Sequence, residues 1–384
     1  MSRKKIFIVS TEFPPGPGGI GSHAYQIAKE LHRLGWDVKV FSEQAWATEE
    51  EIDNYNRNSP FKIFRLFPTP SVLSLVGKFF RLFFAALYYR PDIIFGSGKH
   101  GAWFAILAGK LTFRRTVAAG HGTEFIVTAT PRSRAFNNWI YSSADAIIHV
   151  SEFTKRVAEN AGIKTAKQFV IHNGADDELF YRLPESEVQL FRQEKGLLDK
   201  KIIVTVGNVQ LRKGQEWVVR SMPEIIAAVP NAHYYCVGQA TTRDRLQAIC
   251  KELGVSENVH FTDKVPLKEL RLWLNAADVF AMTSIVTDDG DVEGFGIAVV
   301  EAALCGAPAV VTGESGPGEA IVEGKTGFGV PEKDTKSIAA KIVQLLKDEP
   351  LRKQMSAAAR QDAITARTWS IAVKKYDTVL SELI

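Results

Sequence analysis

Two glutamates, Glu293 and Glu301, lie eight positions apart in the stretch SIVTDDGDVEGFGIAVVEAALCG of residues 284–306. Ionised carboxylates only accept hydrogen bonds, so they suit neighbouring hydroxyl groups such as those of a ribose or a hexose. Eight residues are slightly more than two helical turns, so a loop glutamate and a helix glutamate at this spacing can face one ligand. The spacing fits equally well with Glu293 as a helix cap and Glu301 as a solvated helix residue.

The same stretch predicts a loop that leads into a helix. Gly294 and Gly296 flank Phe295, and an alanine-rich helical pattern follows from Ile297. Glycines leave the first backbone N–H groups of a helix uncovered, and these groups and the helix dipole attract anions. We therefore expect the helix start to bind a phosphate or a sugar attached to one.

A pair of cations stands in a similar position earlier in the chain. Arg212 and Lys213 follow Gly207, which ends the apolar run IIVTVG, and they precede a predicted helix. An arginine can bind a diphosphate through two parallel hydrogen bonds, and a lysine adds a compact positive charge. Such pairs are common on protein surfaces, so this one gains weight only from its place between a strand and a helix.

His121 is a fourth candidate, in the segment AAGHGTEF, with Glu124 in the same turn. It follows an apolar strand pattern, and open α/β sheets bind their ligands at the carboxyl ends of strands. A lone histidine is more often structural, so the position alone leaves both roles open.

The elements that would position these residues alternate along the chain. Short apolar runs that read as buried strands are separated by helical patterns, and this alternation predicts parallel sheets covered on both faces. At 384 residues the chain suits two domains. The predicted strands are residues 4–10, 37–42, 91–97, 116–121, 146–151 and 168–173, and then 202–207, 232–238, 258–263, 277–282 and 307–313.

We therefore predict an α/β protein with two doubly wound, Rossmann-like domains. The first spans residues 1–175 and the second residues 176–369, with the polar stretch ADDELFYRLPESE as a linker near their boundary.

The block EGFGIAVVEA resembles the glutamate pair of the retaining, nucleotide-sugar-dependent glycosyltransferases of group 1 and family 4. This family has the GT-B architecture, in which two Rossmann-like domains face a cleft and a C-terminal helix, here 370–384, returns to the first domain. The resemblance implies that Glu301 holds the nucleotide ribose and that Glu293 faces the donor sugar. It also implies an N-terminal acceptor domain and a C-terminal donor domain.

Other segments resemble the same family. The resemblance implies that Arg212 and Lys213 neutralise the diphosphate, that His121 contacts the donor sugar near the reacting carbon, and that Glu124 lies on the acceptor side. Two cations so close together depart from the longer gap common in the family, which leaves their division of labour open. Further donor contacts are implied at Gly18, Gly19, Gly207, Gly238, Val265, Phe295, Gly296 and Ile297, and Ser315, Gly316 and Glu319 match loosely.

A dehydrogenase is an alternative, because Gly16, Gly18 and Gly21 spell G-x-G-x-x-G and Glu43 ends the second strand. Against it, the residues TEFPP separate the strand from the glycines. Prolines 14, 15 and 17 also supply no N–H group to a pyrophosphate.

Asp289 and Asp291 form a D-x-D sequence, which in the other main glycosyltransferase fold binds a divalent metal. Here it is a polar insertion before Glu293, and Arg212 and Lys213 already answer the diphosphate charge. We interpret it as a solvated loop and expect no essential metal and no cofactor.

Composition and charge suggest where the protein acts. Residues 1–172 carry 22 basic against 13 acidic residues, which predicts an anionic partner such as a membrane surface or an acidic acceptor; we expect no nucleic acid. Cys236, Cys250 and Cys305 lack metal-ligand spacing and indicate a reducing, cytoplasmic location. Residues 71–90 read as a helix with six aromatic residues and Lys78, Arg81 and Arg90. It is either a core helix or a helix lying on the inner face of the cell membrane.

We predict transfer of a hexose from GDP-mannose or a UDP-hexose to a glycan or lipid-linked acceptor, with retention by front-face attack. The wording GDVEGFGI favours a mannosyltransferase. A nucleotide-sugar epimerase and a binding protein without activity remain alternatives on the same fold, while a pyridoxal-dependent phosphorylase finds no lysine context here.

Overall fold

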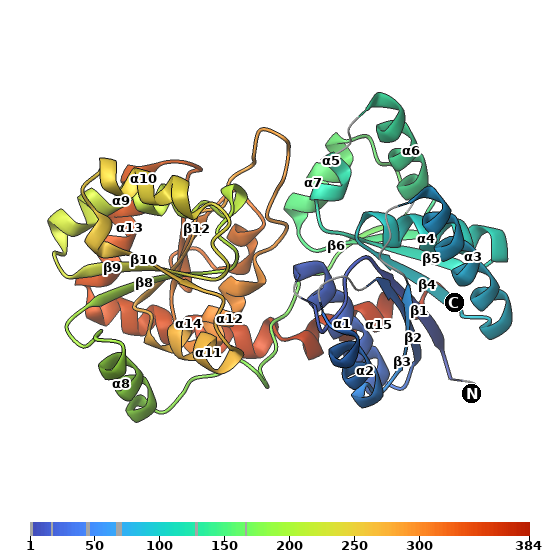
Figure 1. The fold of residues 1–384 in the computed structure, drawn as a ribbon, viewed down its shortest axis with the longest axis horizontal. Coiled ribbons are helices and arrows are strands. Elements are labelled where there is room, and N and C mark those ends of the chain that lie inside the picture. The colour runs from blue at the N-terminus through green and yellow to red at the C-terminus, as the bar shows by residue number, and fades with distance from the viewer. Residues whose placement is uncertain (1–2, 17, 44–46, 67–70, 127–129, 166) are drawn as a thin grey trace. The chain divides into compact units, whose positions relative to one another are not determined.

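The chain divides into two compact units, which we describe separately. The computed structural model describes residues 3–16, 18–43, 47–66, 71–126, 130–165 and 167–384; Pro17 of the glycine-rich loop lies outside them. Unit 1 comprises Met1–Asn173 together with Trp369–Ile384, and unit 2 comprises Gly174–Thr368 (Figure 1). The last helix of the chain therefore belongs to unit 1.

Unit 1 is built on a sheet with strand order β3-β2-β1-β4-β5-β6-β7, and all of its strand pairs are parallel. The order reverses between β1 and β4, which are neighbours in the sheet but not in sequence. The strands are β1 (Lys5–Ser10), β2 (Asp37–Glu43), β3 (Lys62–Leu66), β4 (Ile93–Ser97), β5 (Arg115–Gly120), β6 (Ala146–His149) and β7 (Gln168–Val170).

Helices cover both faces of this sheet. Ile94 of β4 packs in a core with Leu82 and Ala105, whereas the next residue, Phe95, contacts the ring of Tyr376 from the last helix. Successive strand residues point to opposite faces, so both faces are buried. The helices are α1 (Gly19–Arg33), α2 (Glu49–Asn58), α3 (Val72–Tyr89), α4 (Lys99–Thr112), α5 (Thr123–Ile126), α6 (Pro131–Ser142), α7 (Glu152–Asn160) and α15 (Trp369–Ser381).

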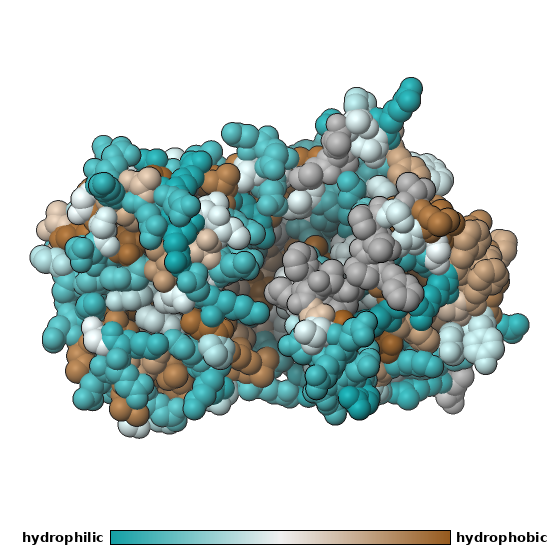
Figure 2. Space-filling view, viewed as in Figure 1, coloured by the Kyte–Doolittle hydropathy of each residue, from teal (hydrophilic) through white to brown (hydrophobic). Residues whose placement is uncertain are grey.

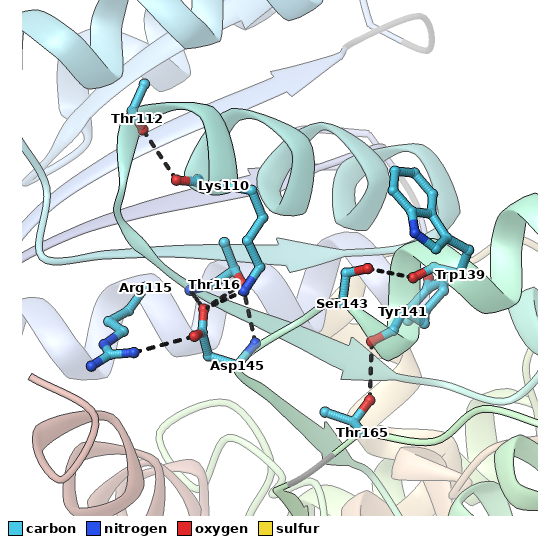
Figure 3. A network of polar contacts seen from close by, with 10 residues as sticks. Lys110, Thr112, Arg115, Thr116, Trp139, Tyr141, Ser143, Asp145 and Thr165 are labelled. Carbon is cyan, nitrogen blue, oxygen red and sulfur yellow. Dashed lines mark hydrogen bonds and ion pairs between the residues drawn. The ribbon is translucent and has the colours of Figure 1, made fainter.

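Asp145 fastens the start of β6 to the start of β5 (Figure 3). Its Oδ2 accepts hydrogen bonds from the backbone N–H of Thr116 at 2.8 Å and from the Thr116 hydroxyl at 2.7 Å. Lys110 and Arg115 add ion pairs at 3.4 and 3.3 Å. Burial alone would raise the pKa of Asp145, but the hydrogen bonds from Thr116 and the Lys110 charge outweigh it and lower the pKa.

Unit 2 repeats the design with strand order β10-β9-β8-β11-β12-β13, again parallel throughout. Its strands are β8 (Lys201–Val206), β9 (Ala232–Val237), β10 (Val259–Asp263), β11 (Val279–Met282), β12 (Ala309–Thr312) and β13 (Gly327–Val330). Its helices are α8 (Glu185–Glu194), η1 (Leu211–Lys213), α9 (Gln215–Ala228), α10 (Arg243–Glu252), η2 (Ser256–Asn258), α11 (Leu267–Ala276), α12 (Ile297–Cys305), η3 (Pro317–Ala320), α13 (Thr335–Lys347) and α14 (Glu349–Ala366).

Every predicted strand is present, and the expected α/β fold is confirmed. Two strands were not predicted. β3, KIFRL, carries a charged residue at each end of a short apolar core, and β13, GFGV, has two glycines in four residues. The segment interpreted as a linker contains the start of α8 at Glu185. The three cysteines are buried free thiols.

The helix predicted over residues 71–90 is α3, but its basic residues do not all face outward. Lys78 is 5% exposed, and its ammonium forms an ion pair with Glu43 at 2.8 Å. Arg81 donates a hydrogen bond to the carbonyl of Arg65. Lys78 therefore neutralises a carboxylate inside unit 1 and does not face the surface. Of the described helices, none combines the length and apolar character that a membrane crossing requires.

Candidate functional site

The switch in strand order of unit 2 gathers the two predicted cations and their glycine. β8 and β11 are neighbours in the sheet although two strands separate them in sequence, and ligands of open α/β sheets bind at the carboxyl ends of such strands. Gly207 follows β8 directly, and the Lys213 side chain lies across it, because a Cβ at Gly207 would be 3.7 Å from the Lys213 ammonium.

The short helix η1, which carries both cations, is fastened to the segment that follows β11. The Arg212 carbonyl accepts a hydrogen bond from the N–H of Ile285 at 2.9 Å, and the Thr283 hydroxyl donates to the Gly214 carbonyl at 2.8 Å. A Cβ at Gly214 would stand 1.8 Å from the Thr283 carbonyl oxygen, so only glycine permits this approach. These backbone contacts thus fix the positions from which the side chains of Arg212 and Lys213 extend.

Glu293 lies between the two cations. Its Oε2 is 2.7 Å from the Lys213 ammonium and forms a second ion pair with Arg212. Burial would raise the pKa of Glu293, but the charges of Lys213 and Arg212 outweigh it and hold the pKa below its usual value. The Glu293 carboxylate is therefore ionised at neutral pH and neutralises the positive charge of Arg212 and Lys213. A diphosphate could neutralise the same charge.

Glu301 sits in the second turn of α12 and behaves differently. Burial raises its pKa to about 7, Lys213 opposes the shift, and Asp176 adds to it. Lys213 therefore interacts electrostatically with both glutamates of the pair. Glu301 changes charge near neutral pH, whereas Glu293 does not.

The start of α12 is open to a ligand only through its backbone. Gly296 caps the helix with a φ of +79° and has no side chain that could bond to the first N–H groups, and the first turn carries no acidic residue. Phe295 is 1% exposed, so its side chain belongs to the core. Ile297 is half-buried. An anion at this helix start would meet backbone N–H groups and the positive end of the dipole.

Two further predicted donor residues lie on neighbouring strand ends. Gly238 follows β9, and a Cβ there would be 2.4 Å from the Gly207 carbonyl oxygen, so the two glycine backbones touch. Val265 is half-buried and follows β10, two residues beyond its end at Asp263. No contact of Val265 with the two cations is found among the described residues.

The D-x-D sequence is not simply a solvated loop. Asp291 pairs with the Arg212 guanidinium, with 3.0 Å between its Oδ2 and Nε. Asp289 instead accepts a hydrogen bond from the Thr287 hydroxyl at 2.5 Å. The two carboxylates thus serve different partners, and across the described residues no group of three or more metal-binding side chains is present.

In unit 1, His121 follows β5 and lies near the end of β4. Its Nε2 is 3.0 Å from the Ser97 hydroxyl, and burial lowers its pKa to about 4, so the ring is neutral at physiological pH. Glu124 accepts a hydrogen bond from the His121 N–H at 2.6 Å and is 6% exposed; burial raises its pKa to about 7. The Glu124 carboxyl therefore holds the turn that carries His121.

The glycine-rich loop differs from a dinucleotide-binding turn. Eight residues separate the end of β1 at Ser10 from the start of α1 at Gly19, and a Cβ at Gly18 would lie 1.9 Å from an oxygen of Glu12. A Cβ at Gly19 would meet no atom within 4 Å. Glu43, the candidate ribose acid of a dehydrogenase, is instead paired with Lys78.

The structure thus brings Arg212, Lys213, Glu293 and Glu301 together in unit 2, and His121 with Glu124 in unit 1. Sequence reasoning missed two members of these groups. Asp176 was placed in a linker, and nothing in its local pattern distinguishes it. Asp291 was recognised only as part of a metal motif.

Comparisons with known proteins identify the family to which the chain belongs. Residues 187–362 match the family model described as Glycosyl transferases group 1, and residues 17–179 match Glycosyltransferase Family 4. The GDP-mannose-dependent alpha-(1-6)-phosphatidylinositol monomannoside mannosyltransferase of Mycolicibacterium smegmatis is 31% identical over 375 residues, 95% of each chain. The GDP-mannose-dependent monoacylated alpha-(1-6)-phosphatidylinositol monomannoside mannosyltransferase of Corynebacterium glutamicum is 27% identical over 98% of each chain.

Among solved structures, Anabaena HepE in complex with UDP and glucose has a TM-score of 0.82 at 19% identity, covering 99% of this chain and 100% of that one. At this identity the likeness concerns the fold alone. It supports the two-unit α/β architecture derived from the strand orders.

Proposed function

This chain belongs to the group 1 and family 4 glycosyltransferases, and on that premise we propose that it transfers mannose from GDP-mannose to a phosphatidylinositol-type lipid acceptor. The transfer retains the anomeric configuration and needs no metal ion. Support for the donor and acceptor comes from the relatives with 31% and 27% identity, whose names give GDP-mannose and phosphatidylinositol mannosides. The wording GDVEGFGI supports the same donor.

One observation carries the proposal: Lys213 interacts with both glutamates of unit 2, because it forms an ion pair of 2.7 Å with Glu293 and its charge opposes the rise in the pKa of Glu301. A diphosphate at this point joins a ribose and a sugar, and the two carboxylates are spaced to accept hydrogen bonds from both. With the donor bound, the diphosphate takes over the charge that Glu293 now supplies to Arg212 and Lys213. Glu293 is then released toward the sugar hydroxyls.

The reaction breaks the bond between the anomeric carbon and the β-phosphate oxygen, and the electron pair stays on that oxygen. Arg212, Lys213 and the first N–H groups of α12 stabilise the growing negative charge, which is the type of interaction that contributes most to catalysis. The acceptor hydroxyl bonds to the anomeric carbon on the same face, and its proton passes to the departing phosphate.

In unit 1, we assign His121 to the donor sugar and the backbone at Gly18 and Gly19 to the donor phosphate. A neutral imidazole suits a sugar, since its second nitrogen can exchange a hydrogen bond with a hydroxyl while Nε2 stays on Ser97. The Glu124 carboxyl holds the turn by accepting the hydrogen bond from the His121 N–H, and we place the acceptor near this turn.

The lipid acceptor requires contact with a membrane, for which α3 offers a surface. Leu73, Val76, Phe80, Phe84 and Leu87 are 44–81% exposed, and their spacing of three and four residues places them on one face of the helix. We call these five residues the α3 stripe. In Figure 2, hydrophobic atoms gather where Figure 1 places α3. An exposed apolar stripe on a helix suits the interface of a bilayer.

The test of this function is a donor panel with a defined acceptor. The protein is incubated with GDP-mannose, UDP-glucose or UDP-galactose in the presence of phosphatidylinositol or its monomannoside, and nucleoside diphosphate and lipid products are measured. We expect GDP release and a mannosylated lipid only with GDP-mannose and acceptor together.

Other outcomes separate the alternatives. An altered donor sugar without transfer would mean an epimerase, and thermal protection by a nucleotide sugar without turnover would mean a binding protein. Transfer of the hexose of a UDP-sugar to the lipid acceptor, with release of UDP, would keep the transferase assignment and reject GDP-mannose as the donor. An α-configured product supports retention, and a β-configured product rejects it.

A further inference from the structure

His23 of α1 occupies a buried position that the proposed mechanism does not use. The side chain is fully buried, and its ring is enclosed by Phe95 of β4, His121 after β5, and Trp369 and Tyr376 of α15. An apolar side chain would fill such a place without cost. A buried imidazole loses its hydration and needs hydrogen bonds in return.

Within the described residues, His23 has one hydrogen-bond partner. Its Nε2 lies 3.1 Å from the hydroxyl of Tyr376, and its Nδ1 has no partner there. Burial lowers the pKa of His23 well below its ordinary value, and His121 lowers it further, so the ring is neutral. The hydroxyl of Tyr376, a fully buried residue, is then the hydrogen-bonding group that holds the plane of the His23 ring.

The ring of His23 in turn supports His121. Their centroids are 4.8 Å apart and their planes meet at 88°, an edge-to-face contact. On its other side His121 is held by Ser97 at 3.0 Å. Rotating the His23 ring would remove one of the two supports that set the direction of the His121 ring.

We propose that Tyr376 of the C-terminal helix is a positioning residue for His121 and acts on it through the ring of His23. The proposal rests on the proposed function in one respect, the assignment of His121 to the donor sugar. It goes beyond that function because it gives α15 a part in the reaction. Misplacing a group in an active site by about 1 Å can lower a rate about 10²-fold.

The first experiment compares Tyr376→Phe with Asp377→Ala. Both remove a polar contact between α15 and the rest of unit 1, since Asp377 accepts a hydrogen bond from the Trp36 indole at 2.8 Å. Of these two residues, only Tyr376 contacts His23. We expect Tyr376→Phe to lower kcat about 10-fold or more with little change in the donor KM, and Asp377→Ala to keep kcat within about twofold. Equal losses of kcat would overturn the proposal, because they would indicate a general loosening of α15.

A double-mutant cycle tests the route through His23. If Tyr376 acts through His23, Tyr376→Phe has no further effect on kcat in a protein that already carries His23→Phe. Additive losses would reject the route. Phenylalanine keeps the six-membered ring of Tyr376 and places an aromatic ring at position 23, and the single variant His23→Phe controls for the larger ring at that buried site.

A second readout does not depend on the reaction. Imidazole nitrogen and carbon NMR signals report the tautomer and surroundings of His23 and His121. We expect Tyr376→Phe to shift both sets and Asp377→Ala to shift neither. Unchanged His121 signals would reject the proposal even if transfer is observed. Shifted signals without any transfer would keep the contact and reject the proposed function instead.

Discussion

The Lys213 ammonium and the Glu293 carboxylate form an ion pair of 2.7 Å, and the same carboxylate also pairs with Arg212. A diphosphate that binds these two cations, as we propose for the donor, would compete with the Glu293 carboxylate for them. The two partners of this ion pair, Lys213 and Glu293, should therefore affect different steps of the reaction.

Replacing Lys213 by alanine should lower kcat by about 10²-fold or more, because one donor to the developing phosphate charge is lost. The measurement is steady-state GDP release with GDP-mannose and acceptor. Lys264→Ala removes an exposed lysine of the same unit and serves as the control. A folded Lys213→Ala protein with the unaltered rate would remove Lys213 from the site.

Glu301 gives a pH-dependent prediction. Its pKa of about 7 lies above the value of about 4.3 in an unfolded chain, so the folded state holds a proton that the unfolded state has lost. The contribution of Glu301 to stability is present at low pH and is lost as the pH rises through 7. We expect Glu301→Gln to come close to the wild type in Tm at about pH 4, near the unfolded pKa, and to exceed it at pH 8.

The same substitution should weaken GDP binding at pH 8 about 10-fold, as expected for the loss of one charged acceptor to the ribose. Calorimetric titration measures the Kd, and Glu257→Gln, an exposed site of the same unit, is the control. A Tm difference that does not vary with pH would show that Glu301 does not titrate as described.

Chelation should leave the transfer rate unchanged. In the proposed function Arg212 and Lys213 supply the positive charge at the diphosphate, and Asp291 forms an ion pair of 3.0 Å with Arg212. We expect full activity in excess EDTA and an unchanged rate for Asp289→Ala, whose carboxylate is solvent-exposed. Loss of activity on chelation, restored by Mn²⁺ or Mg²⁺, would instead make the D-x-D aspartates metal ligands.

Asp145 should make unit 1 sensitive to acid. Its pKa is lowered by the hydrogen bonds from Thr116, so its contribution to stability is present above about pH 4 and is lost as the pH falls through its folded pKa. Asp145→Asn should lower the free energy of unfolding of unit 1 by about 1–3 kcal/mol at pH 7, and the difference should shrink toward pH 3.

Amide hydrogen exchange in β5 and β6 measures this free energy without requiring the two units to unfold together. Asp53→Asn, at an exposed position of α2, is the matched control. If the amides of β5 and β6 exchange at the same rates in both variants, the Asp145 network contributes nothing measurable to the stability of unit 1.

The α3 stripe should bind membranes. We expect the protein to sediment with vesicles containing phosphatidylinositol and phosphatidylglycerol, and Leu73→Ser with Phe84→Ser to lower the partition coefficient about 10-fold or more, because two apolar side chains lose their burial in lipid. Leu190→Ser with Leu198→Ser, which removes two exposed leucines from unit 2, is the control.

Salt distinguishes the forces involved. Attraction between the basic unit 1 and anionic lipid weakens as salt is added, whereas insertion of the stripe does not. Equal binding by wild type and both double variants would reject the stripe while leaving the transferase assignment intact.

Much of this molecule follows from local sequence. Most buried strands were recognisable as short, mainly apolar runs next to a turn signal, as in IIVTV before Gly207. The cation pair and the glutamate pair were recognisable for the same reason, since each lies within one loop and the element beside it.

Other features depend on contacts between distant segments, and sequence offers no local signal for them. The ion pair of Lys78 with Glu43 keeps a basic side chain of the predicted helix 71–90 inside unit 1. Asp291 reaches Arg212 across 79 positions, and the Tyr376 hydroxyl reaches His23 across 353. Only the strand order of each sheet decides which of these distant residues meet.

The return of α15 to unit 1 sets an order of assembly during synthesis. Residues 174–368 are all made after the strands of the first sheet and before Trp369. At about 5–20 residues per second, the ribosome takes roughly 10–40 s to make this stretch. Throughout that time the first sheet lacks the helix that covers Phe95 and His23, so the nascent chain presents apolar surface that chaperones recognise. The whole sequence of unit 2 is synthesised by residue 368, whereas unit 1 is complete only when residues 369–384 have been made. Unit 1 is therefore begun first and completed last.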